Sequence, residues 1–188
     1  MKHLGTITLE TERLILRRFK EDDANMMFLN WANDEEVCRH MTWTPHGNID
    51  LTKYLINLWI DEYKNDNSYN WVIELKEENI IIGSISVVSV NENIKEAVIG
   101  YCIGKNWWRK GYTSEAFSKV IEFLFLDVGF NRIEAAHSVF NPNSGKVMKK
   151  CGLKYEGTLI QKGKNGNGNI VDMCYYGLTR KDYMKEGK

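Results

Sequence analysis

Residues 96–125 constrain the fold of this chain more than any other stretch. Residues 97–103 are apolar and rich in side chains that favour strands. After Trp107, Trp108 and a short polar loop, apolar side chains recur at three- and four-residue steps from Ala116 to Val128. This spacing is typical of a helix that turns one face to a core. The segment therefore predicts a strand, a tight loop and an amphipathic helix.

The loop itself, residues 109–113, has the sequence Arg-Lys-Gly-Tyr-Thr. A helix N-terminus exposes unpaired backbone N–H groups and the positive end of the helix dipole, so it can bind an anion. Gly111 has no side chain to keep a phosphate away from those amides. Only three residues separate Gly100 from Gly104, which excludes the nucleoside-triphosphate loop, and the G-x-G-x-x-G dinucleotide spacing is absent. We predict that this loop binds a pyrophosphate.

Length and charge narrow the class of protein. The chain has 188 residues, 43% of them hydrophobic, and its 25 Lys and Arg balance its 25 Asp and Glu. With a net charge of zero, the chain has no overall electrostatic attraction for nucleic acid or an anionic membrane, and we expect neither as a partner. An apolar leader and a membrane span are both lacking, so a soluble cytoplasmic protein is expected. The four cysteines form no C-x-x-C pair and predict reduced buried thiols rather than disulfides or a metal site.

The remaining sequence predicts short helices and strands around that segment. Helices are expected after Asp22 and Asp23, over residues 34–41, from Asp50 to about residue 65, and from Pro142, with Asn143 or Ser144 as its cap. Strands are expected over residues 9–19, 70–75, 79–90, 132–139, 155–161 and 170–178. Gly83 predicts a bend or bulge. The 132–139 strand should lie parallel to the 97–103 strand, through a right-handed crossover.

Two motifs resemble those of the GNAT acetyltransferase superfamily. Its acetyl-CoA loop follows Arg/Gln-x-x-Gly-x-Gly/Ala, and residues 108–113 read W-R-K-G-Y-T. With S-E-A after it, and the opening T-E-R-L-I-L-R, the chain resembles the ribosomal-protein N-terminal acetyltransferase (Rim-like) branch. Residues 141–144, N-P-N-S, resemble the Asn-x-x-Ser/Ala motif, with Gly152 and Leu153 at the family's spacing.

The resemblance runs from Thr11 to about Leu178 and implies the fold as well as the activity. The implied fold is α+β (mixed α/β), the GNAT acyl-CoA N-acyltransferase fold. Its central mixed sheet is splayed between two parallel strands and flanked by helices. We expect a single GNAT N-acetyltransferase domain over residues 1–188. The implied reaction moves an acetyl group from acetyl-CoA directly to a primary amine in a ternary complex, without a metal.

The resemblance also implies roles for particular residues. Ser144 would lie beside the thioester sulfur as a proton donor, because Met148 occupies the position where many relatives have a tyrosine. Backbone amides of residues 101–103 would face the gap in the sheet and stabilise the developing oxyanion. Cys102 lacks an activating partner in the sequence and is interpreted as a strand residue rather than a nucleophile. The implied acetyl-CoA contacts are Tyr101, Cys102, Ile103, Trp108, Arg109, Lys110, Gly111, Tyr112, Thr113, Asn141 and Ser144, with Lys146 and Lys149 as further phosphate candidates.

The general base and the acceptor stay open at this stage. Four residues are candidates for the base: Glu96, His137, Glu134 and Asp172. The expected acceptor is a protein or peptide N-terminal amine, and the alternatives are a small-molecule amine (polyamine, amino acid or aminoglycoside) or a non-catalytic acyl-CoA-binding regulator. A homodimer is compatible with the sequence. A polycation would need several carboxylates in the cleft, and the early half supplies Asp34, Glu35, Glu36 and Asp61. Aromatic side chains of that half are candidates for the acceptor wall: Trp31, His40, Trp43 and Trp59.

Overall fold

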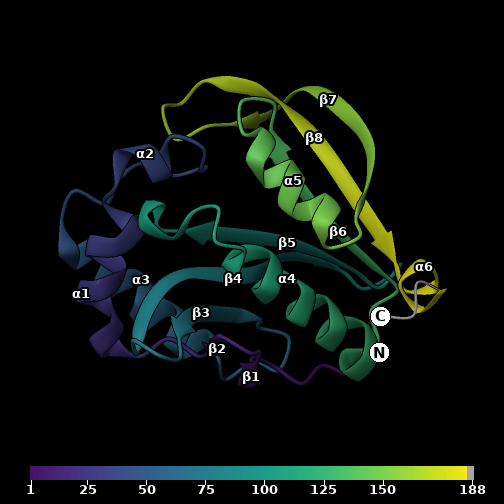
Figure 1. Cartoon of the computed structure of the whole chain (residues 1–188), viewed down its shortest axis with the longest axis horizontal. Helices are drawn as coiled ribbons and strands as arrows, with labels where there is room; N and C mark the ends of the chain where they lie inside the picture. Colours follow the sequence, from purple (N-terminus) through teal and green to yellow (C-terminus); the bar gives the residue numbers. More distant parts are fainter. Residues whose placement is uncertain (186–188) are drawn as a thin grey trace.

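The computed structural model describes residues 1–185, in which eight strands form one mixed sheet with helices on both faces (Figure 1). The spatial order of the strands is β1-β2-β3-β4-β5-β6-β8-β7. The strands are β1 (Leu9–Glu10), β2 (Leu14–Arg17), β3 (Asn70–Leu75), β4 (Ile80–Asn91), β5 (Glu96–Ile103), β6 (Arg132–Ser138), β7 (Lys154–Lys164) and β8 (Ile170–Thr179). The α-helices are α1 (Ala24–Met27), α2 (Glu35–Cys38), α3 (Ile49–Glu62), α4 (Tyr112–Phe123), α5 (Pro142–Lys150) and α6 (Arg180–Lys185). Two 3-10 helices, η1 (Glu21–Asp23) and η3 (Lys105–Trp107), and two π-helical segments, η2 (Phe28–Ala32) and η4 (Leu124–Val128), accompany them.

The sheet opens between β5 and β6, its one parallel pair within the described residues. The two strands pair at only three positions, from Glu96 opposite Arg132 to Val98 opposite Glu134. Beyond Val98 they separate, and β6 continues antiparallel to β8. In Figure 1, β5 and β8 diverge from the side of the molecule where α6 lies. The predicted fold, a mixed sheet splayed between two parallel strands, is confirmed.

Helices cover both faces of the sheet, and the burial of β3 shows it. Trp71, Val72 and Ile73 are three successive residues that point alternately to opposite faces, yet all are fully buried. Helix α4 packs on one face in a cluster that includes Phe117 and Val120. Helices α1 and α3 cover the opposite face in a second cluster. A strand with apolar contacts on both faces reads as a continuous apolar run, as here.

The β3–β4 hairpin contains the predicted irregularity. The register shifts between Ile73 and Glu74, whose partners are Gly83 and Ile81, so β4 carries one extra residue at this point. A Cβ atom on Gly83 would collide with the carbonyl oxygen of Cys102 on β5. Glycine at this position therefore allows β4 to approach the strand that borders the opening.

The central strand, loop and helix are present as predicted. Gly111 precedes α4 with φ +86°, and Gly129 ends the following η4 turn with φ +88°. Both values lie in the left-handed region that glycine occupies without steric cost. The buried face of the continuous helix α4–η4 consists of apolar residues: Ala116, Phe117, Val120, Ile121, Phe123, Leu124, Phe125 and Val128.

Several element boundaries differ from the sequence prediction. The single strand expected over residues 9–19 is two short strands, because the chain turns where the N–H of Thr11 donates to the carbonyl of Leu14. Asn48, rather than Asp50, caps α3 by accepting from the N–H of Asp50. Asn141, rather than Asn143 or Ser144, holds the N-cap position of α5 and makes no side-chain capping bond. The side-chain carboxamide of Asn141 is consequently available to a ligand.

Among residues 1–185 there is no helix with the length and apolar character that a membrane crossing requires.

Candidate active site

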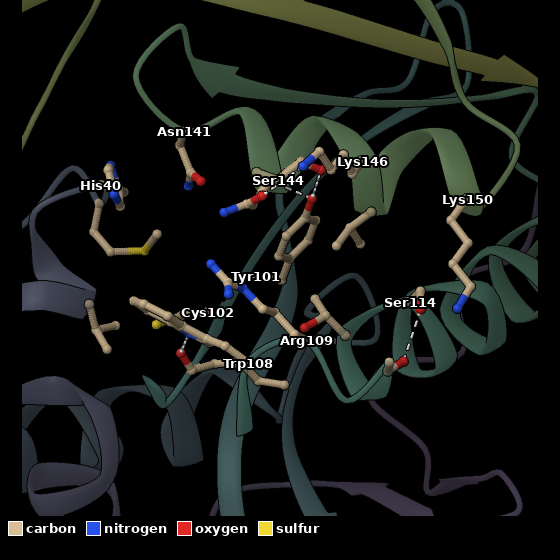
Figure 2. Close-up of a pocket in the computed structure, with 17 residues that line it drawn as sticks. His40, Tyr101, Cys102, Trp108, Arg109, Ser114, Asn141, Ser144, Lys146 and Lys150 are labelled. Atoms are coloured by element: carbon tan, nitrogen blue, oxygen red, sulfur yellow. Dashed lines mark hydrogen bonds between the residues drawn. The ribbon is translucent and has the colours of Figure 1, made fainter. Parts of the chain in front are cut away.

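The opening between β5 and β6 leads into a cavity of about 360 Å³, hereafter the central cavity. Four parts of the fold contribute to its wall: the end of β5, the loop before α4 with the first turn of that helix, one face of α5, and the segment from α2 to Met41 (Figure 2). Its volume lies in the range of small-molecule sites. The lining residues are Val37, His40, Met41, Tyr101, Cys102, Ile103, Trp108, Arg109, Gly111, Thr113, Ser114, Asn141, Asn143, Ser144, Lys146, Val147 and Lys150.

One end of the central cavity is built to bind an anion. The first backbone hydrogen bond of α4 runs from the N–H of Glu115 to the carbonyl of Gly111, so the amides that precede Glu115 have no partner one helical turn back. The Nζ of Lys150 on α5 lies 3.9 Å from the point where a Cβ of Gly111 would be. Figure 2 shows the Lys150 side chain reaching toward Ser114. A helix N-terminus and an ammonium group therefore face the same space.

The N-terminal strands hold this loop in place. Glu115 accepts hydrogen bonds from the hydroxyl of Thr11 at 2.6 Å and from the backbone N–H of Arg13 at 3.0 Å. The Arg13 guanidinium forms an ion pair with Glu115 at 2.6 Å and donates to the carbonyl of Lys110 at 3.2 Å. Arg13 also lies 4.4 Å above the ring of Tyr112. This set of contacts, hereafter the Arg13–Glu115 clamp, fixes both ends of the anion-binding loop.

Two backbone amides of β5 point into the opening. The N–H of Gly104 donates to the carbonyl of Ile82 on β4, and N–H direction alternates along a strand. The amide of Cys102 therefore points to β4, whereas those of Tyr101 and Ile103 point into the gap. The indole of Trp108 donates to the carbonyl of Ile103 at 2.8 Å, which is consistent with this direction.

A hydroxyl pair crosses the central cavity. The phenol of Tyr101 on β5 lies 2.8 Å from the Ser144 Oγ and 3.0 Å from the Ser144 carbonyl oxygen (Figure 2). Burial raises the pKa of Tyr101, so its proton is retained at neutral pH. The Ser144 carbonyl oxygen only accepts, so the phenol proton of Tyr101 goes to it, and the Ser144 hydroxyl can donate to the phenol oxygen or to a ligand. Ser144 is in the first turn of α5, where the helix dipole favours negative charge.

The opposite end of the central cavity is formed by Val37, His40 and Met41, on α2 and the residues after it. The tip of the β7–β8 hairpin closes over this segment (Figure 1). A Cβ on Gly166 at the tip would lie 2.5 Å from the carbonyl oxygen of Trp43 and 3.0 Å from that of Cys38. The sheet thus has two arms, one on each side of the opening between β5 and β6. The hairpin tip of one arm contacts the segment after α2 on the other, at this end of the central cavity.

Most of the residues predicted to contact the cofactor line the central cavity, and two do not. Lys110 and Tyr112 are outside its wall, where the Arg13–Glu115 clamp holds the carbonyl of one and the ring of the other. The phosphate candidate Lys146 lines the wall and Lys149 does not. The predicted residues in the wall are Tyr101, Cys102, Ile103, Trp108, Arg109, Gly111, Thr113, Asn141 and Ser144.

None of the four base candidates lines the central cavity as the structure describes it. Glu96 and Glu134 both bind Arg132, at 2.7 Å and 3.3 Å, where β5 and β6 are still paired. Asp172 accepts from the N–H of Gln161 at 2.7 Å. The sequence could not show how far along their length the two strands stay together, so it did not exclude the residues of the paired region.

His137 is buried beneath α5. Its Nδ1 lies 2.7 Å from the carbonyl oxygen of Ser138, and because a carbonyl only accepts, Nδ1 carries the proton. Its Nε2 has no hydrogen-bond partner among the described residues and faces Gly145, with the ring stacked on Tyr176. The structure therefore brings Ser144, but neither His137 nor Glu96, to the central cavity.

Lys150 and Ser114 were not singled out from the sequence. A signal for Lys150 exists, because Asn143, Lys146, Val147 and Lys150 recur at three- and four-residue steps and so share one face of α5. Lys149 lies off that face. Ser114 carried no signal, since its hydroxyl donates to the carbonyl of Gly111 within the same turn.

Cys102 does not have the surroundings of a nucleophile. Burial raises its pKa, and the nearby Cys38 adds to the rise. Burial likewise raises the pKa of Cys38 to about 12, with a smaller contribution from Asp34. The thiol at 102 therefore stays protonated at neutral pH. Residues 1–185 also contain no cluster of side chains that could hold a metal ion.

The sheet opens between two parallel strands, a helix N-terminus suited to an anion lies at one edge of the opening, and a hydroxyl pair lies inside. This arrangement defines the class of acyl-CoA-dependent acyltransferases. The family described as "Acetyltransferase (GNAT) domain" matches residues 13–154. The chain belongs to this family, as its motifs predicted. It is an acetyltransferase that uses acetyl-CoA and transfers the acetyl group to an amine.

Known proteins resemble this chain over most of its length. The uncharacterized N-acetyltransferase p20 of Bacillus licheniformis is 31% identical over 176 residues, which cover 94% of this chain and 98% of p20. A crystal structure of a GNAT-family acetyltransferase from Bacillus anthracis has a TM-score of 0.81 at 26% identity and covers 93% of this chain and 99% of its own. The [ribosomal protein uS5]-alanine N-acetyltransferase of Escherichia coli (strain K12) is 24% identical over 164 residues, 80% of each protein.

Proposed function

We propose that this acetyltransferase acts on the N-terminal amine of a protein or peptide, and that one domain carries the activity. The observation that carries the proposal is the charge of the central cavity. Among the residues that line it in the described structure there is no carboxylate, whereas Arg109, Lys146 and Lys150 are cations. A polyamine or an aminoglycoside carries several positive charges, and this wall offers no carboxylate to pair with them.

The acidic residues of the N-terminal half do not line the central cavity, and several of them form ion pairs outside it. Lys105 holds Asp34 at 2.8 Å and lies 4.0 Å from Glu36. Burial alone would raise the pKa of Asp34, but Lys105 and the backbone N–H groups of Val37 and Glu36 together outweigh it and keep the pKa below its ordinary value. Asp61 pairs with Lys64 on the surface at 2.7 Å. These carboxylates do not supply a polycation site in the central cavity.

Two further points support an N-terminal amine. The E. coli relative is named for acetylating the alanine N-terminus of a ribosomal protein. A peptide α-amine has a pKa of about 7.7–8.0, against about 10.4 for a lysine side chain. Roughly a fifth to a third of it is therefore already neutral at pH 7.4, and a weak base is enough to complete the deprotonation.

The residues of the central cavity fit acetyl-CoA. Its pyrophosphate would lie at the start of α4, over Gly111 and beside Lys150. Asn141, whose side chain caps no helix, would bind the pantetheine arm along the open edge of β5. When bound, acetyl-CoA supplies the activated acetyl group. The amides of Tyr101 and Ile103 are the donors available to the thioester oxygen as negative charge develops on it.

Ser144 is the proton donor for the sulfur in this mechanism. The Ser144 hydroxyl can turn toward the sulfur from the phenol oxygen of Tyr101, which donates its own proton to the Ser144 carbonyl. As the C–N bond forms and the C–S bond breaks, the sulfur keeps the bonding electron pair and takes the proton from Ser144. Solvent restores the serine proton after the product leaves. Across the turnover one proton moves from nitrogen to sulfur.

A panel of acceptors tests the proposal. The panel consists of hexapeptides with free and blocked N-termini, spermidine, and kanamycin, with CoA release corrected for thioester hydrolysis. We expect kcat/KM for a free peptide N-terminus to exceed that for spermidine at least 100-fold, and no reaction with the blocked peptide. Faster turnover of spermidine or kanamycin would overturn the proposed acceptor. CoA release that no amine accelerates would favour a non-catalytic acyl-CoA-binding regulator.

A further inference from the structure

His40, which the sequence offered only as part of the acceptor wall, is a titratable group that lines the central cavity. It lies at the end formed by Val37 and Met41, across from Asn141 (Figure 2). The other ionisable residues of the wall are three cations, a tyrosine and a cysteine, and burial raises the pKa of the last two. Of the described lining residues, His40 is therefore the one that offers a nitrogen lone pair to a proton.

The surroundings of His40 favour its neutral form. Burial lowers the pKa of His40, and Arg39 lowers it further, while Glu36 opposes them. The charged groups elsewhere in the wall of the central cavity are Arg109, Lys146 and Lys150, all positive. The hairpin tip above it, residues 165–169, has the uncharged sequence Asn-Gly-Asn-Gly-Asn. A neutral imidazole is the form that can accept a proton.

The backbone around His40 is held on both sides. Gly166 of the hairpin tip packs against the carbonyl oxygens of Cys38 and Trp43, which flank His40 in the chain. At the start of α2, Asp34 accepts from the N–H of Glu36 at 2.9 Å and is bound by Lys105, which follows β5. The segment is thus tied to both arms of the open sheet, and His40 faces the space between them.

We propose that His40 is the general base, which takes the proton from the acceptor nitrogen directly or through one water. This rests on the proposed acetyl transfer in the central cavity. The nitrogen lone pair forms the C–N bond, and the N–H proton moves to the imidazole. The C–S electron pair leaves with the sulfur, which is protonated by Ser144. The imidazolium then releases its proton to solvent, and the balance of the turnover is unchanged.

His40→Gln tests the proposal, because glutamine keeps hydrogen-bonding capacity without a titratable lone pair. The acceptor is whichever amine of the panel the wild type turns over, so failure of the peptide acceptor and failure of His40 are separate results. In the wild type, log kcat/KM should fall with slope 1 below the pKa of the amine and with slope 2 below that of His40. In His40→Gln we expect slope 1 throughout and a loss of about 100-fold at pH 7.5.

His46→Gln is the matched control. His46 is six residues further along and its pKa is also lowered by burial, but it binds Thr52 at 2.7 Å and does not line the central cavity. This variant should keep the wild-type profile. Added imidazole should restore at least tenfold activity to His40→Ala, and calorimetric affinity for acetyl-CoA should change less than threefold. A His40→Gln enzyme that retains slope 2, or loses less than threefold, overturns the proposal.

NMR titration of the His40 ring gives a test that needs no acceptor. With acetyl-CoA bound, the resonance missing from His40→Gln should titrate below the ordinary histidine pKa of about 6.5. A ring that is still protonated at pH 8 cannot act as the base and would also overturn the proposal.

Discussion

Tyr101 and Ser144 act as one unit in the proposed mechanism, since the tyrosine donates to the serine carbonyl and its phenol oxygen lies 2.8 Å from the serine Oγ. Ser144→Ala should lower kcat about 100-fold while the affinity for acetyl-CoA changes little, because the lost proton matters only as the C–S bond breaks. Tyr101→Phe should lower kcat less, about tenfold. The double variant should be no slower than Ser144→Ala, since residues that act together are not additive. Additive losses in steady-state kinetics would show that the two hydroxyls act independently.

Gly111 permits a test of the anion-binding loop that separates backbone strain from bulk and charge. Its φ of +86° costs any other residue about 1 kcal/mol, although a Cβ there meets the Nη2 of Arg13 at no less than 3.4 Å. Gly111→Ala should therefore weaken acetyl-CoA binding only several-fold. Gly111→Glu adds a carboxylate where phosphates would lie and should weaken it more than 100-fold by calorimetry. Equal effects of the two variants would argue against a pyrophosphate at this loop.

Arg109 shows the same loop holding an unfavourable backbone conformation. Its φ is +63°, and a residue other than glycine pays of order 1 kcal/mol for it. Arg109 lines the central cavity, so the strain occurs where its guanidinium can face a phosphate. Strain concentrated in a ligand-binding loop is the usual pattern in enzymes.

The Arg13–Glu115 clamp couples the β1–β2 strands to the start of α4. Burial alone would raise the pKa of Glu115, but the hydrogen bonds from Thr11 and Arg13 outweigh it and lower the pKa below its ordinary value. A carboxylate with a lowered pKa stabilises the fold above its unfolded-state pKa, and that stability is lost as the pH falls through the folded-state pKa. The clamp should therefore stabilise the protein at neutral pH and weaken in acid.

Glu115→Gln tests the clamp. We expect a loss of about 1 kcal/mol in the free energy of unfolding at pH 7.5, since Arg13 is partly exposed to solvent. The difference from wild type should shrink as the pH falls below the ordinary glutamate pKa of about 4.3 and through the lowered pKa of Glu115. The KM for acetyl-CoA should rise several-fold, because Arg13 no longer fixes the carbonyl of Lys110. Urea denaturation at both pH values measures the effect, and Glu12→Gln, on the exposed neighbour of Arg13, serves as the control.

The strand, loop and helix at the centre could be predicted because their signals are local. Gly111 and Gly129 fall where backbones need positive φ, and the apolar steps of α4 match one helical face. The contacts that complete the site join residues far apart in sequence: Arg13 with Glu115, and Gly166 with Cys38. A single sequence contains no record of such pairings. The family resemblance predicted the general arrangement of the site, and the structure identified the residues that line it.

Glu96 illustrates why the catalytic groups were harder to predict than the fold. Its sequence position, at the start of the central strand, placed it beside the expected opening. The structure shows that β5 and β6 are still paired there, so Arg132 binds Glu96, Glu134 and Glu156 together and closes that end of the sheet. Whether a strand residue faces a ligand or a salt bridge depends on where the strands separate, and no local pattern encodes that point.

The molecule as a whole consists of two arms of one sheet, joined at the paired ends of β5 and β6 and meeting again at the hairpin tip (Figure 1). The first arm carries α1, α3 and α4, and the second carries α5 between β6 and β7–β8. Acetyl-CoA would be gripped by α4 from the first arm and by Lys150 from the second. In the proposed arrangement, the acceptor reaches the acetyl group past the segment that carries His40, beneath the hairpin tip.

Gly166→Val tests whether the contact between the arms serves the acceptor. A valine at the tip cannot fit against the carbonyl oxygens of Trp43 and Cys38, which are backbone atoms and cannot turn away. The hairpin tip should move away from this backbone, and the segment that carries His40 should lose the contact that holds it in place. We expect kcat/KM for the acceptor to fall at least tenfold while calorimetric affinity for acetyl-CoA changes less than threefold, because Gly111 and Lys150 lie at the other end of the central cavity. Asn167→Ala, on an exposed neighbour in the same tip, should leave both quantities near wild type. If Gly166→Val instead weakened acetyl-CoA binding and acceptor turnover equally, the hairpin would be a general support of the fold, and the assignment of this end to the acceptor would be wrong.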